Sequence, residues 1–158
     1  MSSAEMVWCS AALSLLVFSA GCQPQDTSSL KAEIESSLSS DELMHLVIEP
    51  AADVLWDSAG WVMTLEGETS LVPTTDEEWY STESAAGTII ASGDLLKIPY
   101  PSEDRGEPWS GFADQLSQQG RIALEAALNR DGDALFQAGA TLYQSCVQCH
   151  DVYWTDQQ

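Results

Sequence analysis

Lysine and arginine are unusually rare in this sequence. Only five lysine and arginine residues occur among 158, against 25 aspartate and glutamate residues, so the formal net charge at pH 7 is −20. So few cations cannot form the basic patch that binds a nucleic-acid backbone, which excludes nucleic acid as a partner. The acidity favours a solvated surface, which would also steer a basic partner protein toward the chain.

Cysteine is also scarce, and the four cysteines leave none for a structural disulfide. Cys9 lies in an apolar N-terminal segment, Cys22 follows that segment, and Cys146 and Cys149 share one short motif. Long apolar runs are missing as well, because the run at residues 7–20 is too short to span a bilayer in the usual way. A short apolar run that ends in small residues is typical of a signal peptide.

We therefore expect residues 1–21 to be a signal peptide that exports the chain to the periplasm. The sequence Ser19-Ala20-Gly21-Cys22 resembles the lipobox of bacterial lipoproteins, in which the cysteine receives the lipid. Ser19 stands where leucine is usual, and the first ten residues contain no lysine or arginine, so cleavage by the ordinary signal peptidase is the alternative. A lipid on Cys22 would anchor the protein to a membrane through a polar tether, residues 22–40.

Four amphipathic segments follow the tether, and no strand alternation is apparent. Capping boxes at Ser39–Glu42 and Thr75–Glu78 begin the first two, and Pro50 predicts a kink or a break inside the first. Because most connections are short, residues 41–158 are predicted to form an all-α, antiparallel four-helix bundle. The expected helices are 41–59, 76–97, 109–130 and 133 to about 154. The buried stripe of the first is Met44, Val47, Ala51, Val54 and Leu55.

The motif Cys146-Val147-Gln148-Cys149-His150 carries the strongest chemical signal. Its thiols and imidazole fall at positions i, i+3 and i+4, which places them on one side of the last helix. This spacing is the signature of c-type haem attachment, with two thioethers and His150 as the proximal iron ligand. Chance matches from the chain's own composition are expected only about 0.001 times.

Two other interpretations of this motif are weaker. A zinc site needs about four ligands, and beyond the motif only His45 and Cys22 remain. A thioredoxin-like redox pair normally accompanies a strand–helix–strand pattern, which this sequence lacks. Covalent haem on the last helix therefore stays the leading hypothesis.

The residue on the other side of the iron sets the function of a haem protein. Met44 lies on the apolar stripe of the first helix and could present its thioether to the iron, although methionine at this spacing is often ordinary core packing. His45 is the only other histidine but points away from the stripe, and Met63 follows the first helix. An open site is the remaining alternative.

Arg105 and the aromatic residues after the motif are secondary candidates. Arg105 lies in a loop that is otherwise poor in cations, so it could pair with a haem propionate or be a plain surface charge. Tyr153 and Trp154 follow the motif within one turn and are expected to contact the macrocycle. Trp56, Trp79 and Trp109 are expected to pack between helices.

The chain resembles the class II cytochromes c, the cytochrome c prime family and its low-spin relatives. The matching features are the motif near the carboxyl end, Tyr153 three residues after the histidine, and the long helical region before them. The segment from Leu43-Met44 to Trp56 also looks like a bacterial branch of this family. The resemblance implies that the first helix supplies the residue facing the distal side of the iron. This residue is a methionine in low-spin members, as Met44 would be, and an apolar residue in gas-binding members. Trp154 departs from the family, whose members often carry a cation there.

These observations together predict an exported protein that carries one haem c and transfers electrons, rather than an enzyme. The alternative is a five-coordinate haem protein that binds or scavenges NO or CO. The expected partner is a redox protein, which the acidity favours as a basic one. Pairing of two copies as a homodimer stays open.

Overall fold

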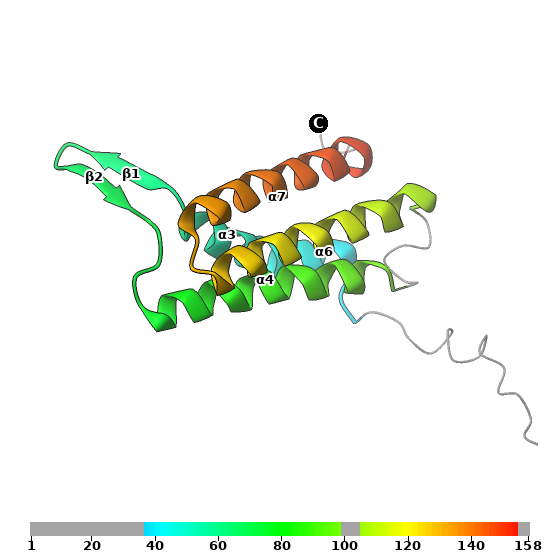
Figure 1. The fold of residues 1–158 in the computed structure, drawn as a ribbon. Coiled ribbons are helices and arrows are strands. Elements are labelled where there is room, and N and C mark those ends of the chain that lie inside the picture. The colour runs from blue at the N-terminus through cyan, green and yellow to red at the C-terminus, as the bar shows by residue number, and fades with distance from the viewer. Residues whose placement is uncertain (1–36, 99–104, 155–158) are drawn as a thin grey trace, which may run out of the picture.

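The computed structural model describes residues 37–98 and 105–154. They form four helical rods and one β-hairpin, and successive rods run in opposite directions along the bundle (Figure 1). The first rod joins three helical segments, and the hairpin separates it from the other three rods. In chain order the elements are α2 (Ser40–Leu43), η1 (Met44–Ile48), α3 (Glu49–Asp57), β1 (Trp61–Thr64), β2 (Gly67–Ser70), α4 (Asp76–Leu96), α6 (Glu107–Leu128) and α7 (Gly132–Tyr153).

The predicted four-helix bundle is confirmed in its coarse form, since the chain is mostly helical and four helices pack against each other. Each expected helix matches an observed rod to within two residues at either end. The predicted signal peptide, Cys22 and the tether up to residue 36 lie outside the described residues. Within the two described ranges, no helix is both long and apolar enough to cross a membrane.

Both predicted capping boxes are present. The Ser39 hydroxyl accepts a hydrogen bond from the Glu42 backbone N–H at 3.2 Å, and the Glu42 carboxylate accepts one from the Ser39 N–H at 2.9 Å. The pair Thr75 and Glu78 repeats this geometry at the start of α4. Because the first N–H groups of a helix have no partner within the helix, these side chains fix where the two rods begin.

The hydrogen-bond pattern of the first rod changes just before Pro50, but the helix does not break there. Pro50 has no N–H, and in a regular α-helix its ring would clash with the carbonyl of Leu46. The chain instead forms one π-helical stretch, η1, in which the Glu49 N–H donates to the Met44 carbonyl five residues earlier. The proline therefore widens the helix locally, and the helical path continues to Asp57.

This widening also shifts the buried face by one residue, which corrects part of the predicted stripe. Leu43 and Ile48 are buried, whereas Met44 and Val47 are only half-buried. A π turn takes one residue more than an α turn, so apolar positions counted at regular α spacing lose phase across it. Beyond Pro50 the prediction holds for Ala51 and Leu55, which are buried, whereas Val54 is half-buried.

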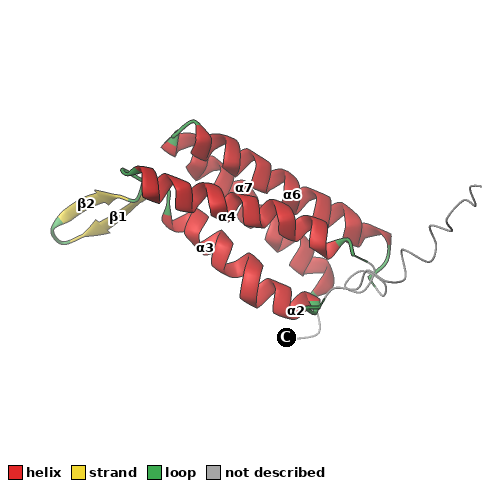
Figure 2. Ribbon diagram, turned by 90° about the horizontal axis from the view of Figure 1, so that it is seen from below, coloured by secondary structure: helices red, strands yellow, loops and turns green. Residues whose placement is uncertain are grey.

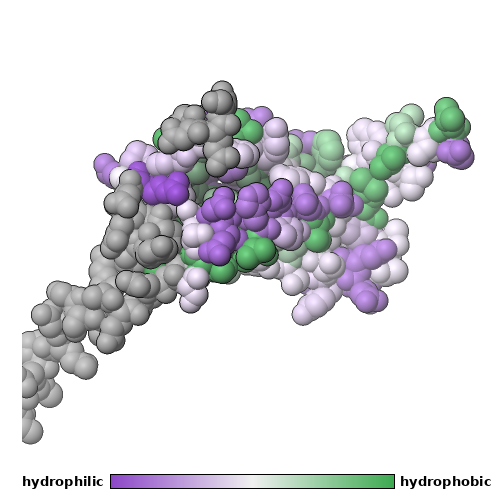
Figure 3. Space-filling view, turned by 180° about the vertical axis from the view of Figure 1, so that it is seen from behind, coloured by the Kyte–Doolittle hydropathy of each residue, from purple (hydrophilic) through white to green (hydrophobic). Residues whose placement is uncertain are grey.

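The hairpin was not predicted. Strands β1 and β2 pair antiparallel, with Trp61 opposite Ser70 and Thr64 opposite Gly67. Every residue of both strands is exposed, so the sequence lacks the alternation that a half-buried strand would show. Trp61 connects the hairpin to α7 (Gly132–Tyr153), because its ring stacks on Phe136 at 5.8 Å between centroids. The hairpin projects from the bundle end opposite to α2 (Figure 2), with apolar residues toward its tip (Figure 3).

The helices α4 and α6 form the most closely packed pair. A Cβ atom added at Gly93 would clash with the Ser117 hydroxyl and lie 2.5 Å from the Ala113 carbonyl, so only glycine allows the two backbones to approach this closely. Small residues elsewhere in the contact between α4 and α6, which we call the closed seam, have the same effect. The core joins all four rods and contains Leu43, Leu55, Trp79, Ala86, Ile89, Trp109, Leu116, Ala123, Ala127, Leu135 and Leu142.

Candidate functional site

Cys146, Cys149 and His150 lie near the carboxyl end of α7, on a helix as their spacing predicted. All three side chains are half-buried, and both thiols are free. Cys146 packs against the hydrophobic core, and the ring of His150 meets the ring of Trp154 edge-on, with 4.9 Å between centroids. The helix thus presents two thiols and one imidazole at the boundary between core and surface.

An uncovered row of apolar side chains runs along α7 and reaches the motif. Tyr143 and Trp154 expose 57% and 55% of their surface in this row. A continuous exposed apolar row marks a surface that another apolar group covers. A planar apolar group bonded to the two thiols would cover its last turns. The row recurs every three or four residues and consists of Phe136, Ala140, Tyr143 and Val147, and Trp154 lies beyond the half-buried His150.

Trp56 ties the first rod to α7 at the other end of this row. Its indole Nε1 donates a hydrogen bond to the Gly139 carbonyl at 3.1 Å. Gly139 makes room for the indole, because a Cβ atom there would lie 3.2 Å from Trp56 Cδ1. Beside the tie, a groove of about 310 Å³ remains open between the rods, lined by Leu55, Trp56, Ala59, Phe136, Gly139, Ala140 and Tyr143. The contact between these rods is therefore incomplete.

This tie sets which residues of the first rod face the motif. The rods run antiparallel (Figure 1), His150 lies eleven residues beyond Gly139, and His45 lies eleven residues before Trp56. At about 1.5 Å of rise per residue, both positions lie about 16 Å from the tie. Met44 and His45 are consequently level with His150, at the end of the bundle where α2 begins.

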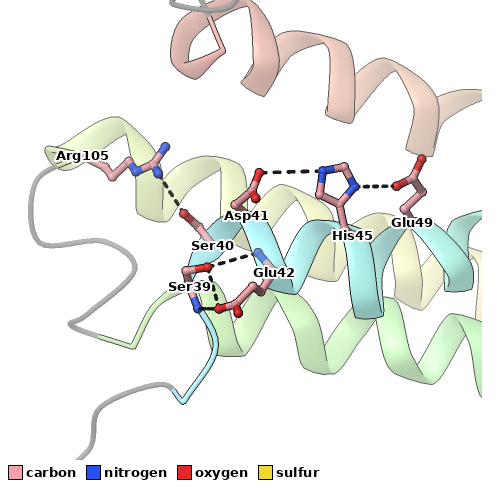
Figure 4. Close-up of polar contacts among 7 residues, drawn as sticks. All are labelled: Ser39, Ser40, Asp41, Glu42, His45, Glu49 and Arg105. Atoms are coloured by element: carbon pink, nitrogen blue, oxygen red, sulfur yellow. Dashed lines mark hydrogen bonds and ion pairs between the residues drawn. The ribbon is translucent and has the colours of Figure 1, made fainter.

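The three candidate sixth ligands have different surroundings. Met44 is half-buried and packs against the core. His45 exposes 67% of its side chain and lies between Glu49, at 3.1 Å, and Asp41, at 3.8 Å, on the side of the helix away from α4 (Figure 4). Met63 lies on β1, exposed in the hairpin at the opposite end of the bundle (Figure 1). By this count of residues, Met44 and His45 lie at about the same height along the bundle as the motif, and Met63 lies at the other end.

The two thiols sit in surroundings that oppose ionisation. Burial raises the pKa of Cys149 to about 11, with a further contribution from the neighbouring Cys146, while the Arg105 guanidinium lowers it. Burial likewise raises the pKa of Cys146. Thiol–disulfide exchange centres lower the pKa of the attacking thiol, because the thiolate is the nucleophile. The surroundings of Cys146 and Cys149 therefore differ from those of a thiol–disulfide exchange centre.

Arg105 lies where the start of α2, the start of α6 and the end of α7 meet. Its guanidinium donates a hydrogen bond to the Ser40 hydroxyl at 2.8 Å (Figure 4) and lies 4.6 Å from the ring centroid of Trp109. Its carbonyl accepts a hydrogen bond from the Tyr153 hydroxyl at 2.8 Å. Tyr153 packs its ring edge-on against Trp109, at 5.0 Å. Trp109 and Tyr153 therefore both contact Arg105 and connect it to the core.

Sequence reasoning found the motif and missed its setting. The exposed apolar row was not recognised, although apolar residues on two faces of the last helix signalled it. The tie between Trp56 and Gly139 had no sequence signal, because a glycine inside a helix does not reveal its neighbour. Trp79 and Trp109 are buried as predicted, and Trp56 is half-buried.

Over residues 37–98 and 105–154, no group of three or more His, Cys, Asp or Glu side chains is arranged to hold a bare metal ion. Comparison of the chain with protein-family models, with curated proteins and with solved structures finds no match.

Proposed function

We propose that this protein is an exported mono-haem c-type cytochrome that transfers electrons. One observation carries the proposal: two free, half-buried thiols and an imidazole follow one another on one helix, beside exposed apolar side chains of the same helix. The donor set fits haem c, because it offers two thiols for thioethers, one nitrogen ligand and apolar surface for a porphyrin face.

Cys146 and Cys149 would hold the haem, and His150 would be its proximal ligand. The two thiols would form the covalent bonds to the porphyrin, as thioethers. The bound iron supplies reversible one-electron chemistry. The residues of this chain fix its position, exclude water from one face through the apolar row, and set the ligand on the distal side.

Met44 is the proposed sixth ligand. It lies level with His150, and its half-buried position keeps the thioether away from bulk water. The competing ring of His45 lies between two carboxylates and is largely exposed. A thioether ligand raises the reduction potential relative to a second imidazole and leaves no open position for gases, which favours electron transfer over gas binding.

The decisive experiment combines mass and spectrum of the exported protein. We expect one covalently added haem that acidified acetone does not remove, and a sharp low-spin spectrum in the reduced state. A Cys146→Ser, Cys149→Ser variant should lose the haem entirely. Absence of added mass in the natural chain contradicts the haem assignment, and an immediate response to carbon monoxide supports the gas-binding alternative instead.

A matched pair of methionine variants tests the sixth ligand. Met44→Ala should convert the iron from low to high spin while the covalent haem remains. Met63→Ala, in the exposed hairpin, removes the same side chain at the other end of the bundle and should leave the spectrum unchanged. An unchanged spectrum in Met44→Ala rejects this ligand, and a His45→Ala variant then tests the imidazole.

Export and anchoring rest on the sequence alone. The proposed signal peptide at residues 1–21 would deliver the chain to the periplasm, where Cys22 would carry a lipid. Replacing Cys22 by serine should release the haem protein from the membrane fraction into the soluble periplasmic fraction. Membrane association that persists in this variant rejects the anchor and leaves the haem assignment untouched.

A further inference from the structure

Arg105 combines two features that no other described cation has together: it is half-buried, and the described residues offer it no carboxylate partner. Lys97 pairs with Asp94 at 2.9 Å and Asp114 at 2.7 Å, and Arg130 pairs with Asp76. In the part of the chain that the structure describes, no carboxylate lies within ion-pair distance of Arg105, although the protein has 25 acidic residues. Arg105 is nevertheless half-buried, where a cation without an anionic partner is unfavourable.

The surroundings hold the guanidinium in one place. Trp109 is buried, its indole Nε1 donates to the Leu96 carbonyl at 2.7 Å, and its ring lies against the guanidinium. The hydroxyl of Ser40 accepts one N–H, which leaves other donors of the planar fork without a partner in the described residues. Arg105 is also tied to the helix that carries the motif, because its carbonyl accepts a hydrogen bond from the Tyr153 hydroxyl at 2.8 Å, three residues beyond His150. A guanidinium without a carboxylate partner among the described residues therefore lies close to the end of α7 that carries the motif.

We propose that Arg105 is a positioning residue that binds a propionate of the haem. The inference rests on the proposed function, because haem c brings the anionic group that this site lacks: its two propionates are carboxylates. A guanidinium fork binds a carboxylate through two parallel hydrogen bonds, and Arg105 comes from a segment distant in sequence from the motif. It would supply the cation that Trp154 does not.

A nearby cation changes the reduction potential in a defined direction. Reduction adds one negative charge to the haem, so a fixed positive charge stabilises the reduced form more than the oxidised form. Neutralising Arg105 should therefore lower the midpoint potential. If Arg105 only joined α2, α6 and α7, its replacement would lower the unfolding temperature. The midpoint potential would then not depend on whether the new side chain is charged.

The test compares four forms of the full exported chain: the natural sequence, Arg105→Gln, Arg105→Lys and Arg121→Gln. Arg121 is exposed on α6, has no ion-pair partner among the described residues, and controls for the loss of one positive charge. For each form, the mass gives the haem content, a redox titration the midpoint potential, and thermal melting the stability. We expect a clear fall of the potential in Arg105→Gln, a smaller one in Arg105→Lys, and almost none in Arg121→Gln.

The outcomes separate this inference from the function on which it rests. A natural chain without covalent haem rejects the proposed function. A natural chain with haem, in which Arg105→Gln and Arg121→Gln have equal potentials, rejects only the role of Arg105. If Arg105→Gln does not fold, Arg105→Met takes its place, because it removes the charge and keeps an apolar contact with Trp109.

Discussion

The helix pair α4–α6 and the pair formed by the first rod and α7 are joined in different ways. In the first pair the backbones touch across Gly93, the Ser117 hydroxyl donates to the Ile90 carbonyl at 3.0 Å, and Trp109 donates across the seam to Leu96. In the second, Trp56 bonds to Gly139 beside an open groove, and the apolar row of α7 continues uncovered.

The two helix pairs therefore differ in how much space they leave for a further group. A seam that glycine and serine close completely leaves no space for a further group and acts as a rigid frame. The other contact holds a hydrogen bond from Trp56 to Gly139 and an open groove beside it, on the same helix that carries the thiols and the imidazole further on. In our proposal the haem completes this second seam, so the cofactor would be part of the core rather than an addition to it.

The largest predicted effect is the loss of the haem itself. In a Cys146→Ser, Cys149→Ser variant, the first rod should lose its contact with the haem, while α4 and α6 keep their contact with each other. Amide hydrogen exchange in the first rod should become about 100-fold faster, since a bound cofactor supplies about 3 kcal/mol and each 1.4 kcal/mol is tenfold. Exchange followed by mass spectrometry on fragments separates the two pairs. Equal loss of protection in α4 and α6 would show that the bundle does not divide in this way.

A smaller effect is expected at the closed seam, where two glycines of α4 serve as a matched pair. Gly93→Ala forces the Cβ atom into Ser117 and should destabilise the protein by about 2–3 kcal/mol. Gly87 meets nothing within 4 Å, so Gly87→Ala should stabilise it by about 0.5–1 kcal/mol through helix propensity. Denaturant unfolding of both variants measures the two effects. Opposite signs are the key result, and destabilisation by both would mean that close packing at Gly93 is not special.

The contrast between the two seams also explains what the sequence could predict. Capping boxes at Ser39 and Thr75 and the motif at Cys146 are local patterns, and the structure confirms the helices that they imply. Local patterns also located the deformation at Pro50. They could not tell that the chain would adopt a π turn rather than a kink, because that choice depends on packing of Leu43 and Ile48 against other rods.

Features that depend on distant contacts were out of reach. The hairpin at Trp61–Ser70 has no buried face, so its sequence carries no periodic signal, and its contact with Phe136 links segments far apart in the chain. Arg105 was a candidate from its isolation among acidic residues. Its stack on Trp109 and its position beside α2 depend on the folded bundle.

A third prediction tests the single tie in the open seam. Trp56→Phe keeps an aromatic ring beside Gly139 and removes the indole N–H that bonds to its carbonyl. The loss of one hydrogen bond should cost about 1 kcal/mol in denaturant unfolding. The same variant should also broaden the low-spin spectrum, since the tie sets the level of Met44 relative to His150. A full loss of the low-spin signal would indicate that the tie does more than set this level.

The smallest effect concerns the capping box of α4, which belongs to the closed seam and should be insensitive to the haem. Hydrogen bonds from the Thr74 and Thr75 backbone N–H groups lower the pKa of Glu78 to about 2. Because the pKa is lower in the folded chain, the ionised carboxylate stabilises the fold above about pH 4.5, and this contribution is lost as the pH falls toward 2. Melting temperatures of Glu78→Gln should therefore lie below those of the natural chain at pH 6 and converge with them near pH 2. Glu77→Gln removes the same charge from the same turn without touching the cap, so its deficit should stay small throughout. If Glu77→Gln shows the same convergence, the effect comes from the helix dipole rather than from the cap, and the start of α4 is less firmly fixed than its geometry implies.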